Sequence, residues 1–190
     1  MNRCQGSSRL DAIIMESETK AKAPSNDRYQ SEELYRRACS LINTQRTMVL
    51  ATEDCSAPWA TPVYFVYSEP GFYFFSSPNA RHIQQAGPGK AVAAAIFADS
   101  NQWEDIQGLQ MSGSLREVNK RTEQLRSIAR FLFKFPFAKP FLQPEDAKGR
   151  GIPNVSDRVR LYAFTPKESY YMNNRLGFGK RFPVDLKRRS

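Results

Sequence analysis

The sequence is poor in the side chains from which metal centres and disulfide frameworks are built. It has one histidine, His82, and three cysteines, Cys4, Cys39 and Cys55. Three cysteines cannot all pair within one chain, and neither their spacing nor a single histidine matches a zinc-binding pattern. We therefore expect reduced thiols and no metal. The sequence also offers no paired carboxylates and no nucleophile with an adjacent base, so nothing indicates a hydrolase.

Long apolar runs are missing as well. No window approaches the roughly 18 uncharged apolar residues of a membrane-spanning helix. The first 20 residues lack the apolar core of a signal peptide. These absences predict a cytoplasmic protein that does not enter a membrane. Residues 1–27 are polar and show no sustained hydrophobic period, so we interpret them as a mobile leader.

Acidic residues are outnumbered by basic ones, 19 to 28, which gives a formal net charge of +9. The excess is uneven, because residues 175–190 hold six basic side chains and one acidic one. Charge gathered at one end is typical of a solvated tail, so residues 183–190 are interpreted as a basic C-terminal tail. We expect only weak electrostatic binding of nucleic acid by this tail, and a specific contact is the less favoured alternative.

What the sequence does contain is enough apolar material for one substantial core. With 190 residues, of which 41% are hydrophobic and 12% aromatic, a single domain is expected over residues 28–182. Helical spacing is present at residues 29–44 and again after Asn119, where an apolar stripe is predicted. The stripe consists of Leu125, Ile128, Ala129 and Leu132. Between these segments, β-rich runs separated by turn residues predict an antiparallel sheet with bends at Gly108 and Gly113.

The stretch at residues 60–85 is the most informative part of the chain. It reads as a strand, a turn at Glu69-Pro70-Gly71, a second strand and a helix that begins at Ser77 and Pro78. Pro62 lies inside the first strand and cannot donate to a ladder, which predicts an edge strand or a bulge. A helix start with free N–H groups suits a phosphate, and three side chains would converge there: Ser76, Ser77 and Arg81. The simpler alternative is a capped surface helix that binds nothing.

A Phe-rich stretch follows the predicted helix after Asn119. Residues 131–142 contain five phenylalanines together with Pro136 and Pro140, so they cannot form one continuous helix. An exposed patch of this kind indicates a partner surface, either over a ligand mouth or in a dimer interface. Residues 144–154 are expected to be a loop, and two further strands are predicted around Pro166.

Five segments occur in an order that resembles a known superfamily. They are PWATPVYFVY, GFYFFSSPNARHIQ, AVAAAIFAD, IQGLQMSGSLREV and NNRLGFGKR. Together they are similar to the FMN-binding split-barrel superfamily typified by pyridoxamine 5'-phosphate oxidase, and most of all to a small bacterial branch that ends in a Leu-Gly-Phe-Gly-Lys motif, here Leu176 to Lys180. The resemblance implies a mainly β fold, a six- or seven-stranded antiparallel Greek-key split barrel with three flanking helices.

The same resemblance implies FMN as cofactor and a homodimer with the flavin at the subunit interface. It places Trp59, Thr61 and Val63 beside the isoalloxazine ring. The phosphate would be held by Ser76, Ser77 and Arg81, while Trp103 and Gln107 would approach from the second subunit. For Trp59, an ordinary core or interface aromatic remains the alternative.

The final motif departs from that of the vitamin oxidases. In those enzymes an Arg-Leu-His arrangement holds the substrate, and here Arg175 and Leu176 match it, whereas Gly177 stands at the histidine position. Arg175 and Lys180 are therefore weak candidates for substrate binding, and Lys180 could equally be a surface lysine. The resemblance implies an FMN-dependent oxidoreductase that acts on a small cytoplasmic molecule. The alternative is a binding or storage protein for flavin, heme or deazaflavin, without turnover.

Overall fold

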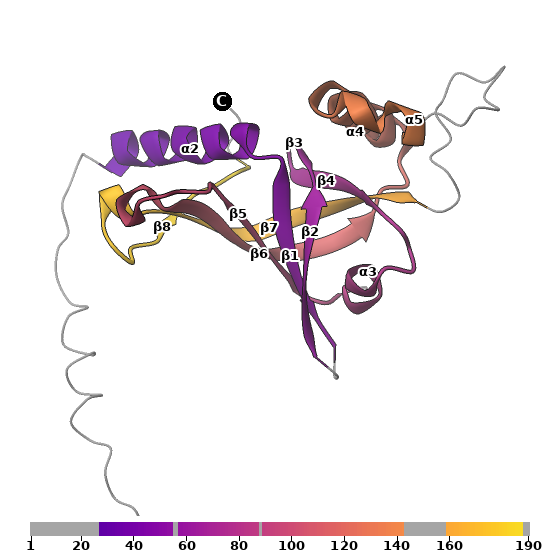
Figure 1. The fold of residues 1–190 in the computed structure, drawn as a ribbon, viewed down its shortest axis with the longest axis horizontal. Coiled ribbons are helices and arrows are strands. Elements are labelled where there is room, and N and C mark those ends of the chain that lie inside the picture. The colour runs from indigo at the N-terminus through magenta and orange to yellow at the C-terminus, as the bar shows by residue number, and fades with distance from the viewer. Residues whose placement is uncertain (1–26, 55–56, 88, 143–158, 188–190) are drawn as a thin grey trace, which may run out of the picture.

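The computed structural model describes residues 27–54, 57–87, 89–142 and 159–187, and element labels follow Figure 1. Its centre is one curled sheet of eight antiparallel strands, open on one side, with helices around it. The strands are β1 (Thr47–Glu53), β2 (Pro58–Tyr64), β3 (Val66–Ser68), β4 (Gly71–Ser76), β5 (Val92–Phe97), β6 (Gln107–Glu117), β7 (Arg160–Asn173) and β8 (Phe182–Pro183). This confirms the predicted mainly β, split-barrel fold, although the two-residue strand β8 brings the number of strands to eight, where six or seven were expected.

The strand order is β2-β1-β5-β6-β7-β4-β3, with β8 paired to β7. Strands β5, β6 and β7 are consecutive neighbours, and β4, which precedes them, lies on the far side of β7. That arrangement is a Greek key. The sheet path ends at β2 on one side, and β2 approaches β4 across the split without joining it in a ladder. The predicted edge strand at Pro62 is confirmed, and β2 pairs with β1 from Tyr64 to Pro58 without a bulge.

The helices are α2 (Asp27–Thr44), α3 (Arg81–Gln85), α4 (Arg121–Lys134) and the single turn α5 (Lys139–Leu142). Figure 1 shows α2 lying across the sheet over β5 and β6, α3 beside β1 and β2, and α4 with α5 beyond the β3–β4 hairpin. Short 3-10 turns complete the chain at η1 (Trp103–Asp105), η2 (Pro136–Ala138) and η3 (Asn174–Leu176). No helix among these described segments has the length and apolar character needed to cross a bilayer.

The main core lies between α2 and the concave face of the sheet. The apolar face of α2, predicted from its spacing, is buried there: Leu34, Ala38, Leu41 and Ile42 are at most 8% exposed. A second, smaller core lies under α4, where Phe131 and Phe135 pack on Tyr73 of β4 and Ala163 of β7. The β4–β7 part of the sheet is therefore covered on both faces.

The predicted apolar stripe on α4 is partly wrong. Ile128 is buried as expected, but Leu125 and Ala129 are exposed, and the buried face is completed by Ser127 and Phe131. The helix is rotated because Phe131 and the following Phe135 are larger anchors than leucine or alanine, and they define which face enters the core. Asn119 is also not the cap, since the residue before the helix is Lys120, which makes no side-chain cap.

Three smaller expectations have mixed outcomes. The Phe-rich stretch is interrupted as predicted, because α4 ends at Lys134 and a 3-10 turn begins at Pro136. Gly113 marks a register shift between β6 and β7, whereas Gly108 lies in regular pairing and is no corner. The two strands predicted around Pro166 are one strand, β7. The loop predicted at residues 144–154 and the leader lie outside the described residues, except for residue 27 in α2.

The chain stays packed beyond the predicted domain end at residue 182. Val184 and Leu186 are 7% and 3% exposed and belong to the main core. The Tyr67 hydroxyl donates a hydrogen bond of 2.6 Å to the Leu186 carbonyl. The first part of the predicted tail is therefore a packed segment.

Candidate functional site

Arg81 and Trp59 form the centre of the first group of predicted site residues. Arg81 is the first residue of α3, and Trp59 lies on β2. The guanidinium carbon of Arg81 lies 4.4 Å from the centroid of the Trp59 ring, a cation–π contact. Stacking uses the flat face of the guanidinium, so the N–H donors at its edge still point outward in the plane. The contact therefore holds the Arg81 side chain in place and leaves its N–H donors able to bind an anion.

Trp59, Thr61 and Val63 share one face of β2, because alternate residues of a strand point the same way. Val63 is 9% exposed and Trp59 is 43% exposed, so this face runs from the core to solvent. Between them, the Thr61 hydroxyl is buried without a hydrogen-bond partner among the described residues. A buried hydroxyl left unpaired costs about 1–3 kcal/mol. The face thus has a polar atom that a ligand could satisfy.

The predicted cap at Ser77 is wrong. The Ser77 hydroxyl accepts from the Asn79 N–H at 3.2 Å, and the Ser77 carbonyl accepts from the Ala80 N–H at 3.0 Å. These bonds close a turn around Pro78, and α3 begins only at Arg81. Local serine bonds of this kind compete with helix capping. Because α3 has five residues, its dipole contributes little, and an anion here must be held by side chains and turn N–H groups.

His82 lies beneath this group and was not expected there. It is 6% exposed, and its Nε2 is 2.9 Å from the Ser76 hydroxyl at the end of β4. Burial lowers the pKa of His82 below its usual value, so the ring is neutral at pH 7. His82 therefore fixes the Ser76 side chain and does not add charge to the site.

Gln85 fastens the other end of α3. Its Oε1 accepts from the Thr52 hydroxyl at 2.8 Å, and its Nε2 donates to the Ala57 carbonyl at 3.2 Å. Both Gln85 and Thr52 are buried. Together with His82, this amide ties the short helix to β1, β4 and the residue that leads into β2. The sequence signal was available, since His82 and Gln85 lie three residues apart and share one helix face.

Trp103 and Gln107 belong to a second group. Trp103 is 58% exposed on η1, and its ring packs edge-to-face with Phe178 at 5.8 Å between centroids. The Gln107 Oε1 accepts from the Tyr171 hydroxyl at 2.8 Å, and Asn173 donates to the same hydroxyl at 3.2 Å. Gln107 is thus held in a defined position at the start of β6.

Arg175 lies in the same group, and its partner is a carboxylate. Its Nε donates to Asp105 at 2.5 Å, and this bond raises the pKa of the guanidinium above its usual value. Gly177 has a φ of +151°, and a Cβ built there would lie 2.7 Å from Cδ of Lys180. An L side chain rarely adopts this backbone conformation, and the Lys180 stem fills the space. The position that holds histidine in the vitamin oxidases is therefore shaped for glycine.

The two groups lie apart within one chain. In Figure 1, α3 and the nearby end of β2 are at one end of the sheet, whereas the turns at residues 103–105 and 174–181 are at the other. The structure brings Trp59, Arg81 and Ser76 into one region through α3. It does not bring Trp103, Gln107, Arg175 or Lys180 to that region.

The fold and the first group define a split-barrel protein with an open edge strand beside a short, firmly anchored helix. Sequence comparison adds a set of relatives, although no family model matches the chain. A UPF0306 protein of Klebsiella pneumoniae strain 342 is 26% identical over 125 residues, which cover 65% of this chain and 74% of that protein. A UPF0306 protein of Cronobacter sakazakii is 26% identical over 140 residues, 72% of this chain and 85% of that protein. The predicted resemblance to a small bacterial branch is confirmed.

Solved structures with the same fold include a putative pyridoxamine 5'-phosphate oxidase and two heme proteins. A putative pyridoxamine 5'-phosphate oxidase of Listeria innocua has a TM-score of 0.55 at 15% identity, over 74% of this chain and 98% of that chain. HutZ, the heme storage protein of Vibrio cholerae, has a TM-score of 0.55 at 19% identity, over 70% and 90%. A heme binding protein of Mycobacterium smegmatis has a TM-score of 0.61 at 16% identity, over 88% and 60%. At these identities the likeness establishes the fold.

Proposed function

We propose that this protein binds FMN in the region of β2 and α3 and uses it to oxidise or reduce a small cytoplasmic molecule. The observation that carries the proposal is the face of β2 formed by Trp59, Thr61 and Val63. It lies on an edge strand, it contains a buried hydroxyl without a partner, and a stacked guanidinium stands at its exposed end. A flat ligand with polar ring edges and a terminal phosphate fits each of these features.

The ring of the flavin would lie along β2. An edge strand leaves backbone N–H and C=O groups without ladder partners on its outer side. Those groups and the Thr61 hydroxyl can pair with the polar edge of an isoalloxazine, while Val63 gives an apolar contact. Bound FMN would supply the hydride or electron transfer, and the protein would supply position and electrostatics.

The phosphate would lie at the turn before α3. Arg81 is the cation for it, because a cation–π contact leaves the N–H donors at the edge of a guanidinium able to bind an anion. The Ser77 hydroxyl accepts one bond from Asn79 and still has its own proton to donate. The Ser76 hydroxyl is oriented by neutral His82. Charge-assisted hydrogen bonds are worth about 1.5–3 kcal/mol each, which makes Arg81 the largest single contributor.

We propose further that the protein is a homodimer. Ala60, Ala51 and Ala93 are paired across β2, β1 and β5, and all three are exposed on the outer face of the sheet. Such a flat row of small side chains lets a second sheet approach closely. In such a dimer the partner's Trp103 and Gln107 are expected to approach the flavin, because those of the same chain lie at the other end of the sheet. The expected observation is a dimer in sedimentation equilibrium.

The substrate is expected to differ from the phosphorylated vitamin. Gly177 replaces the histidine of the vitamin oxidases, and Arg175 is paired with Asp105. Neither residue is available in the role that the vitamin enzymes require. Turnover of pyridoxamine 5'-phosphate by the FMN-loaded protein is therefore predicted to be absent.

A second candidate function is non-catalytic binding or storage of heme, flavin or a deazaflavin. The observation in its favour is that two proteins of the same fold are described as heme binding or heme storage proteins. Heme iron needs an axial ligand, commonly histidine. The only histidine of the sequence is buried and bonded to Ser76, which favours flavin over heme.

Absorbance separates these candidates. Purified protein mixed with FMN should give a bound-flavin spectrum and quenched flavin fluorescence, whereas hemin should give no shifted Soret band. Stopped-flow mixing of the reduced flavoprotein with a panel of acceptors then tests turnover. Slow reoxidation by every acceptor would favour storage, and a Soret shift without flavin binding would overturn the proposal.

A further inference from the structure

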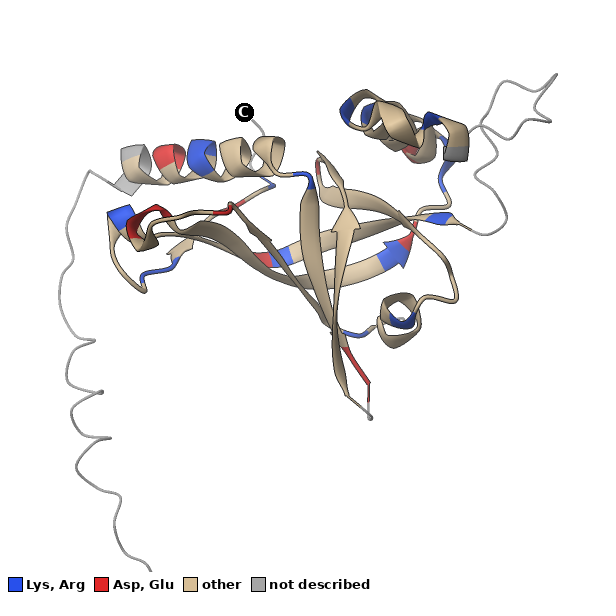
Figure 2. Cartoon of the chain, in the orientation of Figure 1, with Lys and Arg blue, Asp and Glu red and all other residues tan. Residues whose placement is uncertain are grey.

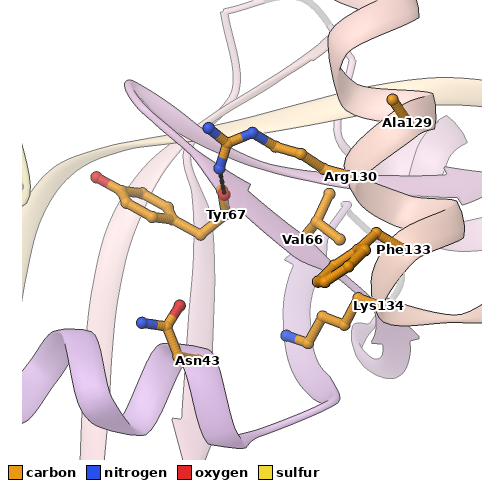
Figure 3. A pocket seen from close by; sticks show the side chains of 7 residues that line it. All are labelled: Asn43, Val66, Tyr67, Ala129, Arg130, Phe133 and Lys134. Atoms are coloured by element: carbon orange, nitrogen blue, oxygen red, sulfur yellow. Dashed lines mark hydrogen bonds between the residues drawn. The ribbon is translucent and has the colours of Figure 1, made fainter.

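A cavity of about 520 Å³ opens between the C-terminus of α2, strand β3 and helix α4. Its lining consists of Asn43, Val66, Tyr67, Ala129, Arg130, Phe133 and Lys134 (Figure 3). None of these residues belongs to the proposed flavin site. The volume lies within the roughly 300–1,000 Å³ of small-molecule sites.

The cavity has an apolar wall. Among its lining residues Val66 is buried and Phe133 is 90% exposed. An exposed phenylalanine loses favourable burial unless something covers it. In Figure 3 the ring of Phe133 stands close to Val66 and faces the same open space as the polar side chains. This wall fits a flat, apolar molecular body.

Two cations stand at the cavity, and the lining residues include no carboxylate. Figure 2 shows that α4 carries most of its charges as Lys and Arg. Arg130 reaches the Tyr67 carbonyl with one nitrogen at 3.5 Å, and its guanidinium has further N–H donors. Neither Arg130 nor Lys134 takes part in an ion pair among the described residues, unlike Arg116 and Arg160 on β6 and β7.

Lys134 is held in place within this cavity. Its ammonium donates to the carbonyls of Gln45 at 2.7 Å and Ile42 at 3.4 Å, and it lies 4.2 Å from the centroid of the Phe65 ring. Burial and the nearby charge of Arg46 lower the pKa of Lys134 to about 8. A half-buried cation without a counter-ion is stabilised when an anion binds beside it. The position therefore favours a negatively charged ligand.

We propose that this cavity binds a small organic anion with a flat apolar body. Its acid group pairs with Arg130 and Lys134, and its body lies between Val66 and Phe133. The Asn43 amide, which Figure 3 shows on the opposite side of the open space, is placed to contact a further polar group of the ligand. The cavity is separate from the proposed flavin site, and the acid that binds there is a substrate or an effector of the protein.

The test uses two probes of equal shape, 2-naphthoate and its neutral analogue 2-naphthamide, titrated calorimetrically into the full chain saturated with FMN. If FMN does not bind, the same titration is run without it, so this test does not depend on the flavin proposal. We expect naphthoate to bind at least about tenfold more tightly than naphthamide, as one charge-assisted contact implies. Equal affinities, or competition between naphthoate and FMN for the cofactor-free chain, would overturn the inference.

Three variants locate the binding. Arg130→Gln should weaken naphthoate about tenfold and leave naphthamide within about twofold, while Phe133→Ser should weaken both probes. Arg126→Gln is the matched control, because Arg126 is also exposed on α4 but does not line this cavity. If Arg126→Gln weakens naphthoate as much as Arg130→Gln does, the attraction is general to the helix charge and the proposed site is wrong.

Discussion

Replacement of Arg81 by alanine separates a phosphate ligand from a surface residue. Arg81→Ala removes one charge-assisted hydrogen-bonding group, worth about 1.5–3 kcal/mol, so FMN affinity should fall about tenfold to a hundredfold. It also removes the stack on Trp59, an exposed cation–π contact worth about 0.5–1 kcal/mol. The loss of this contact does not depend on the phosphate, so it should weaken FMN and riboflavin equally. Riboflavin affinity should therefore change by less than about fivefold.

The assay is isothermal titration of each variant with FMN and with riboflavin. Arg81→Lys should recover part of the FMN loss, because lysine keeps the charge and loses the planar pair of donors. Arg36→Ala is the matched control, since Arg36 pairs with Glu33 on the surface of α2. Parallel losses for both flavins would indicate a damaged fold. Unchanged affinity for both would refute the phosphate role, and Arg81 would then only cover Trp59.

Three further outcomes are expected. Gly113→Ala should lower the free energy of unfolding by about 1–3 kcal/mol or more, because the new Cβ would clash with the backbone carbonyl of Thr165. Gly87→Ala is the control and should change it by less than about 0.5 kcal/mol, with both variants measured by unfolding in urea. The pKa of Lys134 falls from 10.5 to about 8 on folding, so between these pH values the unfolded chain holds more protons than the folded one. The wild type should therefore gain stability relative to Lys134→Met as pH rises from about 8 to 10.5. Truncation after Leu186 should leave FMN affinity within about twofold and lower affinity for polyanions in a low-salt titration; a tenfold loss of FMN would contradict this.

Much of the fold could be predicted because its hydrophobic patterns are regular. Strand β1 (Thr47–Glu53) lies in the region where β-rich runs are predicted, and its alternate residues face the core. The apolar face of α2 was equally clear. The face of α4 was not, because Leu125 and Ala129 have helical spacing, and only the packing of Phe131 and Phe135 on β4 and β7 decides which side is buried.

The candidate site was less predictable because short-range hydrogen bonds decide its geometry. Ser77 and Pro78 have the composition of a helix start, yet the same serine atoms close a turn with Asn79 and Ala80. The role of His82 depends on its distance to Ser76, six residues earlier in the chain and in another element. Trp59 was named from the resemblance and Arg81 from the predicted helix start, but their cation–π contact is a tertiary contact that local sequence does not encode.

The most direct test of the central claim is a parallel titration of cofactor-free protein with FMN, riboflavin and hemin. The arrangement of β2, Arg81 and the turn at Ser77 predicts saturable binding of FMN, at least tenfold tighter than that of riboflavin, and no Soret shift with hemin. Equal affinity for FMN and riboflavin would show that no phosphate is held at this turn. Tight hemin binding without flavin binding would contradict the flavin assignment itself.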